Sequence, residues 1–368
     1  MGIFKQRCYS GSRQSIGEKY GEDTRELIRN HLEIIYDSAM NKSGSSRLTL
    51  LDSALGYLPF IEKYSPGFAE ELVGLSRGAH ISMNEAVLLQ VRQEAIYSAA
   101  FEYRSECTSF AVCGRYTPGG EVYIGQNLDL IGAFEEITSV VVLAPDDAPA
   151  VMMVLPAGQI SNTGLNELGM GVNCNFLSCR GWKVGYPRYL VSRLLLEQGT
   201  CFRARDVMNT ITELASSRNI LISDIGGKIF DFEMTPYEVG VIEANDMLVH
   251  SNHFINSKMK KYECANTPSA ALSMADSEWR KARLEELLRS AFGRVDVPAL
   301  MEFLRDHMTS PQSGSSSICM HASPDTKGYH TAASFISDLN NRVMYACSGN
   351  PCTGSYIKYE FPSNMRSW

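Results

Sequence analysis

Apolar residues follow a helical period in the first quarter of the chain. Between residues 17 and 89 they recur three or four positions apart, which predicts a series of amphipathic helices. Ser65 followed by Pro66 is typical of a helix start, with a cap and a proline in the first turn. Ser82–Glu85 has the form of a capping box, so a further helix is expected from there to about Ala99.

The pattern changes at Cys107. Residues 108–115 and 121–126 read as strands, and the Thr-Pro-Gly-Gly sequence between them predicts a hairpin. Further strands are expected at 137–143, 150–155, 170–175, 219–223, 228–234, 239–244, 332–339 and 342–347, and further helices at 188–197, 203–215 and 278–308. This order predicts an α+β fold in which sheets pack together and helices cover them. A four-layer αββα sandwich is one such fold, and the pattern alone leaves other α+β folds open.

Composition narrows the class of protein. The 368 residues are 44% hydrophobic and 20% charged, with a net charge of −7, and no long basic run offers a footprint for nucleic acid. No apolar segment approaches the roughly 20 residues of a membrane helix. The first eight residues lack the apolar stretch of a secretion signal, so the ten cysteines are read as mainly reduced thiols. We therefore expect a cytoplasmic protein that binds neither nucleic acid nor membrane.

Cys107 differs from the other cysteines in its surroundings. Cysteine is among the most buried residue types, and most of the ten are expected to fill the core. Cys107, however, opens a strand after the polar and charged stretch 102–106 and precedes the hydroxyl residues Thr108 and Ser109. This context makes its thiol a candidate nucleophile.

Five short motifs occur in a fixed order from Cys107 onward. They are Cys107–Phe110, Gly125–Asp129, Gly164–Asn173, Pro187–Leu190 and His250–Phe254. With these motifs the chain resembles the cysteine Ntn hydrolases, the family of penicillin acyltransferase (acyl-coenzyme A:6-aminopenicillanic acid acyltransferase) and of carcinine and β-alanyl-dopamine hydrolases. The resemblance implies the αββα sandwich. It also implies a zymogen that cleaves itself between Glu106 and Cys107, giving a helical α-chain of residues 1–106 and a catalytic β-chain of residues 107–368 within one fold.

The same resemblance assigns roles to individual residues. Cys107 would be the nucleophile, and its freed α-amine would serve as the base, since an α-amine titrates near neutral pH. Asp129 would hydrogen-bond this amine, and the Asn252 amide would stabilise the oxyanion. Asn173 or Asn175 is expected to add a further oxyanion contact.

The histidines near Asn252 have a different expected role. His250 and His253, with Cys264 downstream, lack the second pair of ligands that a zinc site requires, so no metal is expected there. They are expected to orient Asn252 or to line the pocket.

Three positions depart from the pattern of the relatives. Glu106 stands where penicillin acyltransferase has glycine before its nucleophile, which removes the most permissive residue from a backbone expected to be strained. Gln126 stands where bile-salt and penicillin V hydrolase relatives have arginine. His330 stands near the place of a late arginine that some relatives carry.

The sequence thus predicts an enzyme that acts on non-peptide C–N bonds. The leading interpretation is a self-processing amidohydrolase that cleaves small N-acyl amides. The expected substrates are β-alanyl or other short N-acyl amines. An acyltransferase would pass the same acyl group to an amine or to coenzyme A. No cofactor is expected, although a coenzyme A thioester would be a substrate in that case. An uncleaved, catalytically silent binding protein is the alternative from another class, whereas a papain-like protease lacks the local sequence expected around its cysteine.

Overall fold

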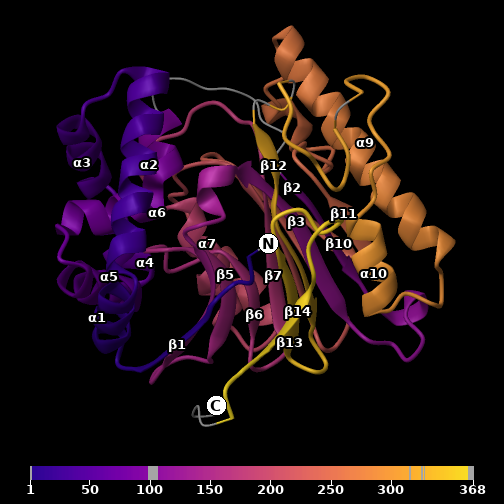
Figure 1. Cartoon of the computed structure of the whole chain (residues 1–368), viewed down its shortest axis with the longest axis horizontal. Helices are drawn as coiled ribbons and strands as arrows, with labels where there is room; N and C mark the ends of the chain where they lie inside the picture. Colours follow the sequence, from indigo (N-terminus) through magenta and orange to yellow (C-terminus); the bar gives the residue numbers. More distant parts are fainter. Residues whose placement is uncertain (1, 98–106, 315, 325, 327, 364–368) are drawn as a thin grey trace.

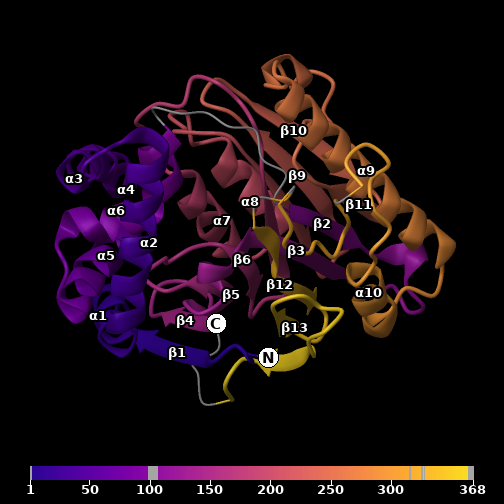
Figure 2. The same cartoon turned by 45° about the horizontal axis from the view of Figure 1, so that its top comes forward.

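The computed structural model describes residues 2–97, 107–314, 316–324, 326 and 328–363. Two sheets pack face to face at the centre, and helices cover the outer face of each (Figure 1). The same order of layers is seen in the turned view (Figure 2). The predicted α+β class and its αββα layering are confirmed.

Both sheets are mostly antiparallel. The eight-stranded sheet has the order β1 (Gln6–Gly11), β4 (Thr138–Pro145), β5 (Val151–Pro156), β6 (Thr163–Asn166), β7 (Met170–Phe176), β8 (Arg218–Asp224), β9 (Ile229–Met234) and β10 (Val239–Ala244). The six-stranded sheet has the order β11 (Met247–His250), β2 (Cys107–Val112), β3 (Tyr123–Ile131), β12 (Tyr329–Asp338), β13 (Val343–Ser348) and β14 (Ile357–Glu360). Strands β1 and β4 pair in parallel.

The helices fall into two groups. Those on the side of the eight-stranded sheet are α1 (Arg13–Asp23), α2 (Arg25–Ser43), α3 (Arg47–Leu55), α4 (Leu58–Tyr64), α5 (Pro66–Ala79), α6 (Met83–Tyr97), α7 (Arg188–Leu196) and α8 (Cys201–Met208). Those against the six-stranded sheet are α9 (Pro268–Ser290) and α10 (Val297–Leu304). Single 3₁₀ turns occur at Gly114–Tyr116, Gly132–Phe134 and Lys260–Tyr262. Within the described part of the chain, no helix combines the length and apolar character needed to span a bilayer.

Side-chain alternation along β2 sets the direction of the candidate nucleophile. Successive side chains on a strand point to opposite faces of the sheet. Cys107 and Ala111 belong to the core between the two sheets, whereas Phe110 and Val112 pack toward α9 and α10. Cys107 therefore presents its thiol to the space between the sheets, while its neighbour Thr108 faces α9.

The N-terminal segment is integrated into the sandwich. Strand β1 extends the eight-stranded sheet, and a fully buried ion pair joins Glu71 of α5 to Arg193 of α7, with 2.7 Å between Oε1 and Nη1. Removing one member of such a pair leaves an uncompensated buried charge. The division at 106/107 stays a prediction, because Glu106 lies outside the described residues.

The element boundaries test the sequence patterns. The capping box at the start of α6 is confirmed, since Ser82 Oγ accepts a hydrogen bond from Glu85 N and Glu85 Oε2 accepts one from Ser82 N. The expected end of this helix at Ala99 lies outside the described residues. The helix expected at 203–215 is wrong beyond Met208, and the block expected at 278–308 is two helices, separated by a turn in which Gly293 has φ +76°.

Candidate active site

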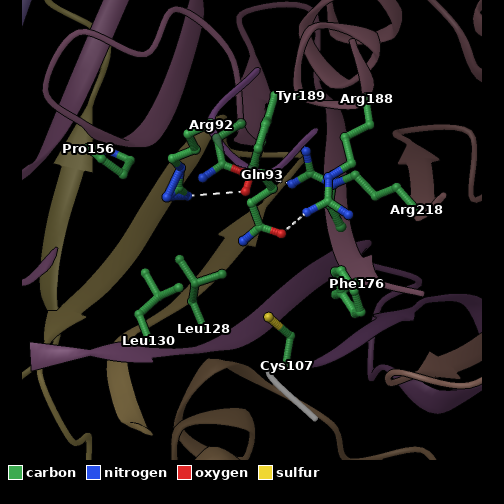
Figure 3. Close-up of a pocket in the computed structure, with 12 residues that line it drawn as sticks. Arg92, Gln93, Cys107, Leu128, Leu130, Pro156, Phe176, Arg188, Tyr189 and Arg218 are labelled. Carbon is green, nitrogen blue, oxygen red and sulfur yellow. Dashed lines mark hydrogen bonds between the residues drawn. The ribbon is translucent and has the colours of Figure 1, made fainter. Parts of the chain in front are cut away.

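Cys107 lies at the floor of a pocket between the two sheets. It is 5% exposed and is the first residue of β2. Its thiol points into the cavity, with Leu128 and Leu130 to one side and arginine side chains across from it (Figure 3). The lining residues are Arg92, Gln93, Cys107, Leu128, Leu130, Pro156, Asn162, Cys174, Phe176, Arg188, Tyr189 and Arg218. The pocket is therefore built by α6, both sheets and α7 together.

The main chain of Cys107 is held at both of its polar atoms. Its nitrogen donates to Asn252 Oδ1 at 3.0 Å, and its carbonyl oxygen accepts from Arg280 Nη1 at 2.7 Å. Arg280 also donates to Asn252 Oδ1 at 2.9 Å and to Thr108 Oγ1 at 2.6 Å. The backbone nitrogen that self-cleavage would turn into an amine is thus already bonded to a fixed acceptor.

Arg280 determines which way the Asn252 amide is turned. A guanidinium group only donates hydrogen bonds, so the Asn252 atom that faces Arg280 has to be the oxygen. The amide nitrogen then points the other way and donates to the carbonyl oxygen of Phe176 at 3.1 Å. Asn252 therefore lies beside Cys107, with its oxygen directed at the Cys107 nitrogen. Its role as an oxyanion donor stays a prediction.

Sequence reasoning missed Arg280, although a signal was present. The buried positions of α9 include Ser277, Arg280, Leu284 and Leu288, which recur at helical spacing and form one stripe. Arg280 is 0% exposed within this stripe. A charged residue on the apolar face of a helix needs a buried partner, and this requirement marks Arg280 as a candidate site residue.

His253 lies beside the main chain of Asn252. Ser277 Oγ accepts a hydrogen bond from Asn252 N at 2.7 Å and lies 2.8 Å from His253 Nδ1. Burial, together with nearby positive charges, lowers the pKa of His253 to about 3, so the ring is neutral at physiological pH. His253 contacts Asn252 through Ser277 and does not line the pocket.

His250 belongs to a buried acidic network instead of the pocket. Its Nε2 lies 3.0 Å from Glu233 Oε1 and 3.8 Å from Asp231 Oδ2. Burial lowers the pKa of His250, but the two carboxylates outweigh burial and the pKa is raised. The pKa of Asp231 is raised to about 7, chiefly by its own burial. The network contacts the chain on both sides of Asn252: His250 Nδ1 lies 2.8 Å from Ser251 O, and Glu233 accepts from the backbone N–H groups of Ile255 and Asn256.

Asp129 lies in β3, one position beyond Leu128, which is the register partner of Cys107. It is fully buried, and its Oδ1 accepts a hydrogen bond from Thr331 Oγ1 of β12 at 2.7 Å. The carboxylate is therefore fixed from the far side of β3, close to the beginning of β2.

The remaining expected residues occupy supporting positions. On β7, the side chain of Asn173 donates to Gly125 O at 2.7 Å, and that of Asn175 accepts from Ser109 Oγ at 2.5 Å. Gln126 donates to Cys174 O at 2.6 Å, so these three side-chain amides tie the two sheets together and are absent from the pocket lining. His330 pairs with Glu135 and also lies outside the lining.

Three arginines surround the ring of Tyr189 on the other side of the pocket. The guanidinium carbons of Arg92, Arg188 and Arg218 lie 5.1, 5.2 and 4.6 Å from the ring centroid. All three residues are buried, with 3–5% of their surface exposed. The pocket thus places a thiol opposite a cluster of buried positive charges.

All ten cysteines lie within the described residues, and none of them is joined in a disulfide. Cys174, Cys179 and Cys201 are buried, and burial raises the pKa of each thiol above its usual value. These cysteines fill the core, as most cysteines were expected to do.

The chain is similar to proteins of known activity. Residues 116–353 match the model of the family described as acyl-coenzyme A:6-aminopenicillanic acid acyl-transferase. The 40 kDa form of acyl-coenzyme A:6-aminopenicillanic-acid-acyltransferase from Emericella nidulans is 26% identical over 291 residues, which cover 78% of each chain.

Solved structures with low sequence identity were also found. Penicillin V acylase from Agrobacterium tumefaciens has a TM-score of 0.46 at 12% identity, over 69% of this chain and 86% of the other. A single-residue variant of conjugated bile acid hydrolase from Clostridium perfringens has a TM-score of 0.43 at 14% identity, over 71% of this chain and 98% of the other. The family match covers well over half of the chain, so the protein belongs to the acyl-coenzyme A:6-aminopenicillanic acid acyl-transferase family.

Proposed function

We propose that the protein is a self-processing amidohydrolase with an N-terminal cysteine nucleophile. The observation that carries the proposal is the hold on Cys107: its thiol enters the pocket, while its nitrogen and carbonyl oxygen are bonded to Asn252 and Arg280. In self-cleavage, Cys107 Sγ attacks the preceding carbonyl carbon. The peptide nitrogen leaves as the amine, and water hydrolyses the resulting thioester.

The same groups support turnover of an external amide. The freed amine takes the thiol proton and Sγ attacks the substrate carbonyl, giving a tetrahedral oxyanion. Asn252 Nδ2 gives one hydrogen to the carbonyl oxygen of Phe176, a residue of the pocket, and its other hydrogen, with nearby backbone N–H groups, is the proposed donor to that oxyanion. The amine then protonates the leaving nitrogen, and water releases the acyl group from Sγ.

Acyl transfer uses the same acyl-enzyme. A second amine would replace water in the last step, and the name of the family describes such a transfer, from an acyl-coenzyme A to 6-aminopenicillanic acid. The thiol of coenzyme A would be another acceptor for the same acyl group. Hydrolysis requires no second binding site, and for that reason we favour it.

The buried arginines of the pocket favour binding of a substrate that carries an anionic group. Arg92 donates to the Tyr189 hydroxyl and Arg218 to Asn162 Oδ1, both neutral partners. Within the described residues, neither guanidinium forms an ion pair, and Arg92 Nε and Arg218 Nη1 are buried without a hydrogen-bond partner. The nearby carboxylate of Glu94 accepts instead from the backbone N–H of Arg188 and the hydroxyl of Ser216. Burying cations without a counter-charge is costly, so a carboxylate on the acyl or the amine part of the substrate would supply what the pocket lacks.

Self-cleavage is tested by intact mass spectrometry of the purified protein beside Cys107→Ala. We expect two fragments in the wild type, the larger beginning at Cys107, and a single chain in the variant. Cys113→Ala, which changes a buried thiol just beyond β2, serves as the matched control and should be processed. One unbroken chain in all three would contradict the proposal and favour the silent binding protein.

Arg280 is expected to act as a positioning residue for Cys107. Arg280→Met should slow self-cleavage by about 10²-fold, because small displacements of a reacting group cost rates of this order. Arg280→Lys should restore part of the rate, since lysine keeps the charge but not the fork of donors. Arg283→Met, one turn along the same helix, is the control, because it also removes an arginine of α9, one that pairs with Asp306 beyond α10. Time courses of the soluble, folded fraction measure the rate, and wild-type processing of Arg280→Met would refute this role.

The substrate charge is tested with three chromogenic amides. They are butyryl p-nitroanilide, glutaryl p-nitroanilide and 5-butyramido-2-nitrobenzoate, which carry no carboxylate, one on the acyl part and one on the amine part. At least one of the two carboxylated compounds should be cleaved with a kcat/KM about tenfold or more above that of the neutral compound. Tenfold corresponds to about 1.4 kcal/mol of transition-state binding.

The arginine variants show which groups recognise the carboxylate. Arg92→Met or Arg218→Met should remove the preference, and the exposed Arg203→Met should leave it intact. A processed enzyme that cleaves all three amides equally well would exclude the anionic subsite and leave the amidase intact.

A further inference from the structure

Four metal-binding side chains converge far from Cys107 in the sequence and outside its pocket. His307, Cys319, His321 and Cys352 each offer one nitrogen or sulfur atom, and these atoms all lie within 4.8 Å of one another. None of the four lines the pocket of Cys107. The cluster is therefore a feature that the proposed amidase chemistry does not use.

The distances between these atoms match the edges of a tetrahedron. Zinc binds histidine nitrogen at about 2.0–2.1 Å and cysteine sulfur at about 2.3 Å, so a tetrahedral site has N–N edges of roughly 3.3 Å and N–S edges of roughly 3.6 Å. His307 Nε2 lies 3.1 Å from His321 Nε2. His321 Nε2 lies 3.4 Å from Cys352 Sγ and 4.0 Å from Cys319 Sγ. An ion could thus be reached by all four atoms with small side-chain adjustments.

We propose that His307, Cys319, His321 and Cys352 bind a structural zinc ion. Two thiolates with two imidazoles form a donor set that zinc prefers, whereas magnesium and calcium prefer oxygen ligands. Four protein ligands fill the tetrahedron and leave no position for a reacting water, which is characteristic of structural sites.

The ligands come from two separate connections of the chain. His307, Cys319 and His321 lie between α10 and β12, and Cys352 lies between β13 and β14. These connections have little regular structure of their own. A shared ion would crosslink them, and binding energy at such a site adds directly to folding stability.

Neighbouring hydrogen bonds lead from the cluster to the candidate active site. Met320, which lies between two of the ligands, donates from its backbone N to Thr331 Oγ1 at 3.0 Å. Thr331 in turn donates to Asp129 Oδ1 at 2.7 Å. Asn350 supports the same segment by donating to Met320 O at 2.6 Å. A zinc ion here would fix the segment that holds Asp129 in place.

The metal content of the untagged, full-length protein tests the proposal. Elemental analysis should find about one zinc per chain, and Cys352→Ser and His307→Ala should each lose it. Cys264→Ser, a partly exposed cysteine outside the cluster, is the matched control and should keep the metal. If a cluster variant fails to fold, the wild-type protein is tested by cobalt reconstitution. After metal removal under reducing conditions it should take up one Co²⁺ and show the visible spectrum of a tetrahedral thiolate site.

Two results would overturn the zinc site. One is a wild-type protein that contains no zinc and takes up neither Zn²⁺ nor Co²⁺. The other is a Cys319–Cys352 disulfide in freshly purified protein, detected by peptide mass mapping without reduction, because a disulfide would remove both sulfur ligands. The outcome does not depend on self-cleavage, so the amidase and the metal site fail or stand separately.

Discussion

The candidate active site depends on one buried cation. Arg280 reaches from α9 to the carbonyl oxygen of Cys107 and to Asn252 Oδ1, and it is 0% exposed. A buried guanidinium is tolerated only when its donors are matched by acceptors. The same requirement that keeps Arg280 stable therefore fixes the beginning of β2, the orientation of Asn252 and the distance between them. The geometry of the candidate site and the burial of Arg280 thus depend on the same hydrogen bonds.

The layered fold builds the pocket from both segments of the chain, residues 1–106 and residues 107–368. The thiol comes from the six-stranded sheet, the arginines come from α6, α7 and β8, and only the packing of these layers brings them together. Cleavage before Cys107 would break a covalent link without removing any layer. The N-terminal segment contributes Arg92 and Gln93 to the pocket, so it would remain part of the active site after processing.

The sequence predicted the layers better than it predicted the contacts. Long strands with buried residues, such as β4 and β8, were evident from composition, and the hairpin of β2 and β3 from its turn residues. Strands β6, β11 and β14 have four residues each, which is too short for an alternating pattern to stand out. Strand β1 was missed because it pairs in parallel with β4, a partner more than a hundred residues away in the sequence.

The site residues likewise divide into those that a local motif predicts and those that only the folded structure reveals. Cys107 and Asn252 could be proposed from motifs, and the structure places them beside each other. Arg280 and the arginines around Tyr189 carry no local signature, because their role arises from burial and from partners far along the chain. The metal-ligand cluster also escaped notice, since its four residues lie on two connections, are spread over 46 positions of the sequence and are brought together only by the fold.

The proposed reaction requires Cys107 to carry the acyl group. The experiment is to mix the processed protein with the p-nitrophenyl ester of acetate or of glutarate, quench with acid and measure fragment masses. We expect a mass increase equal to one acyl group on the fragment that begins at Cys107, and none on Cys107→Ala. An acyl group found on another residue, or p-nitrophenol release without any adduct on that fragment at the earliest times, would contradict it.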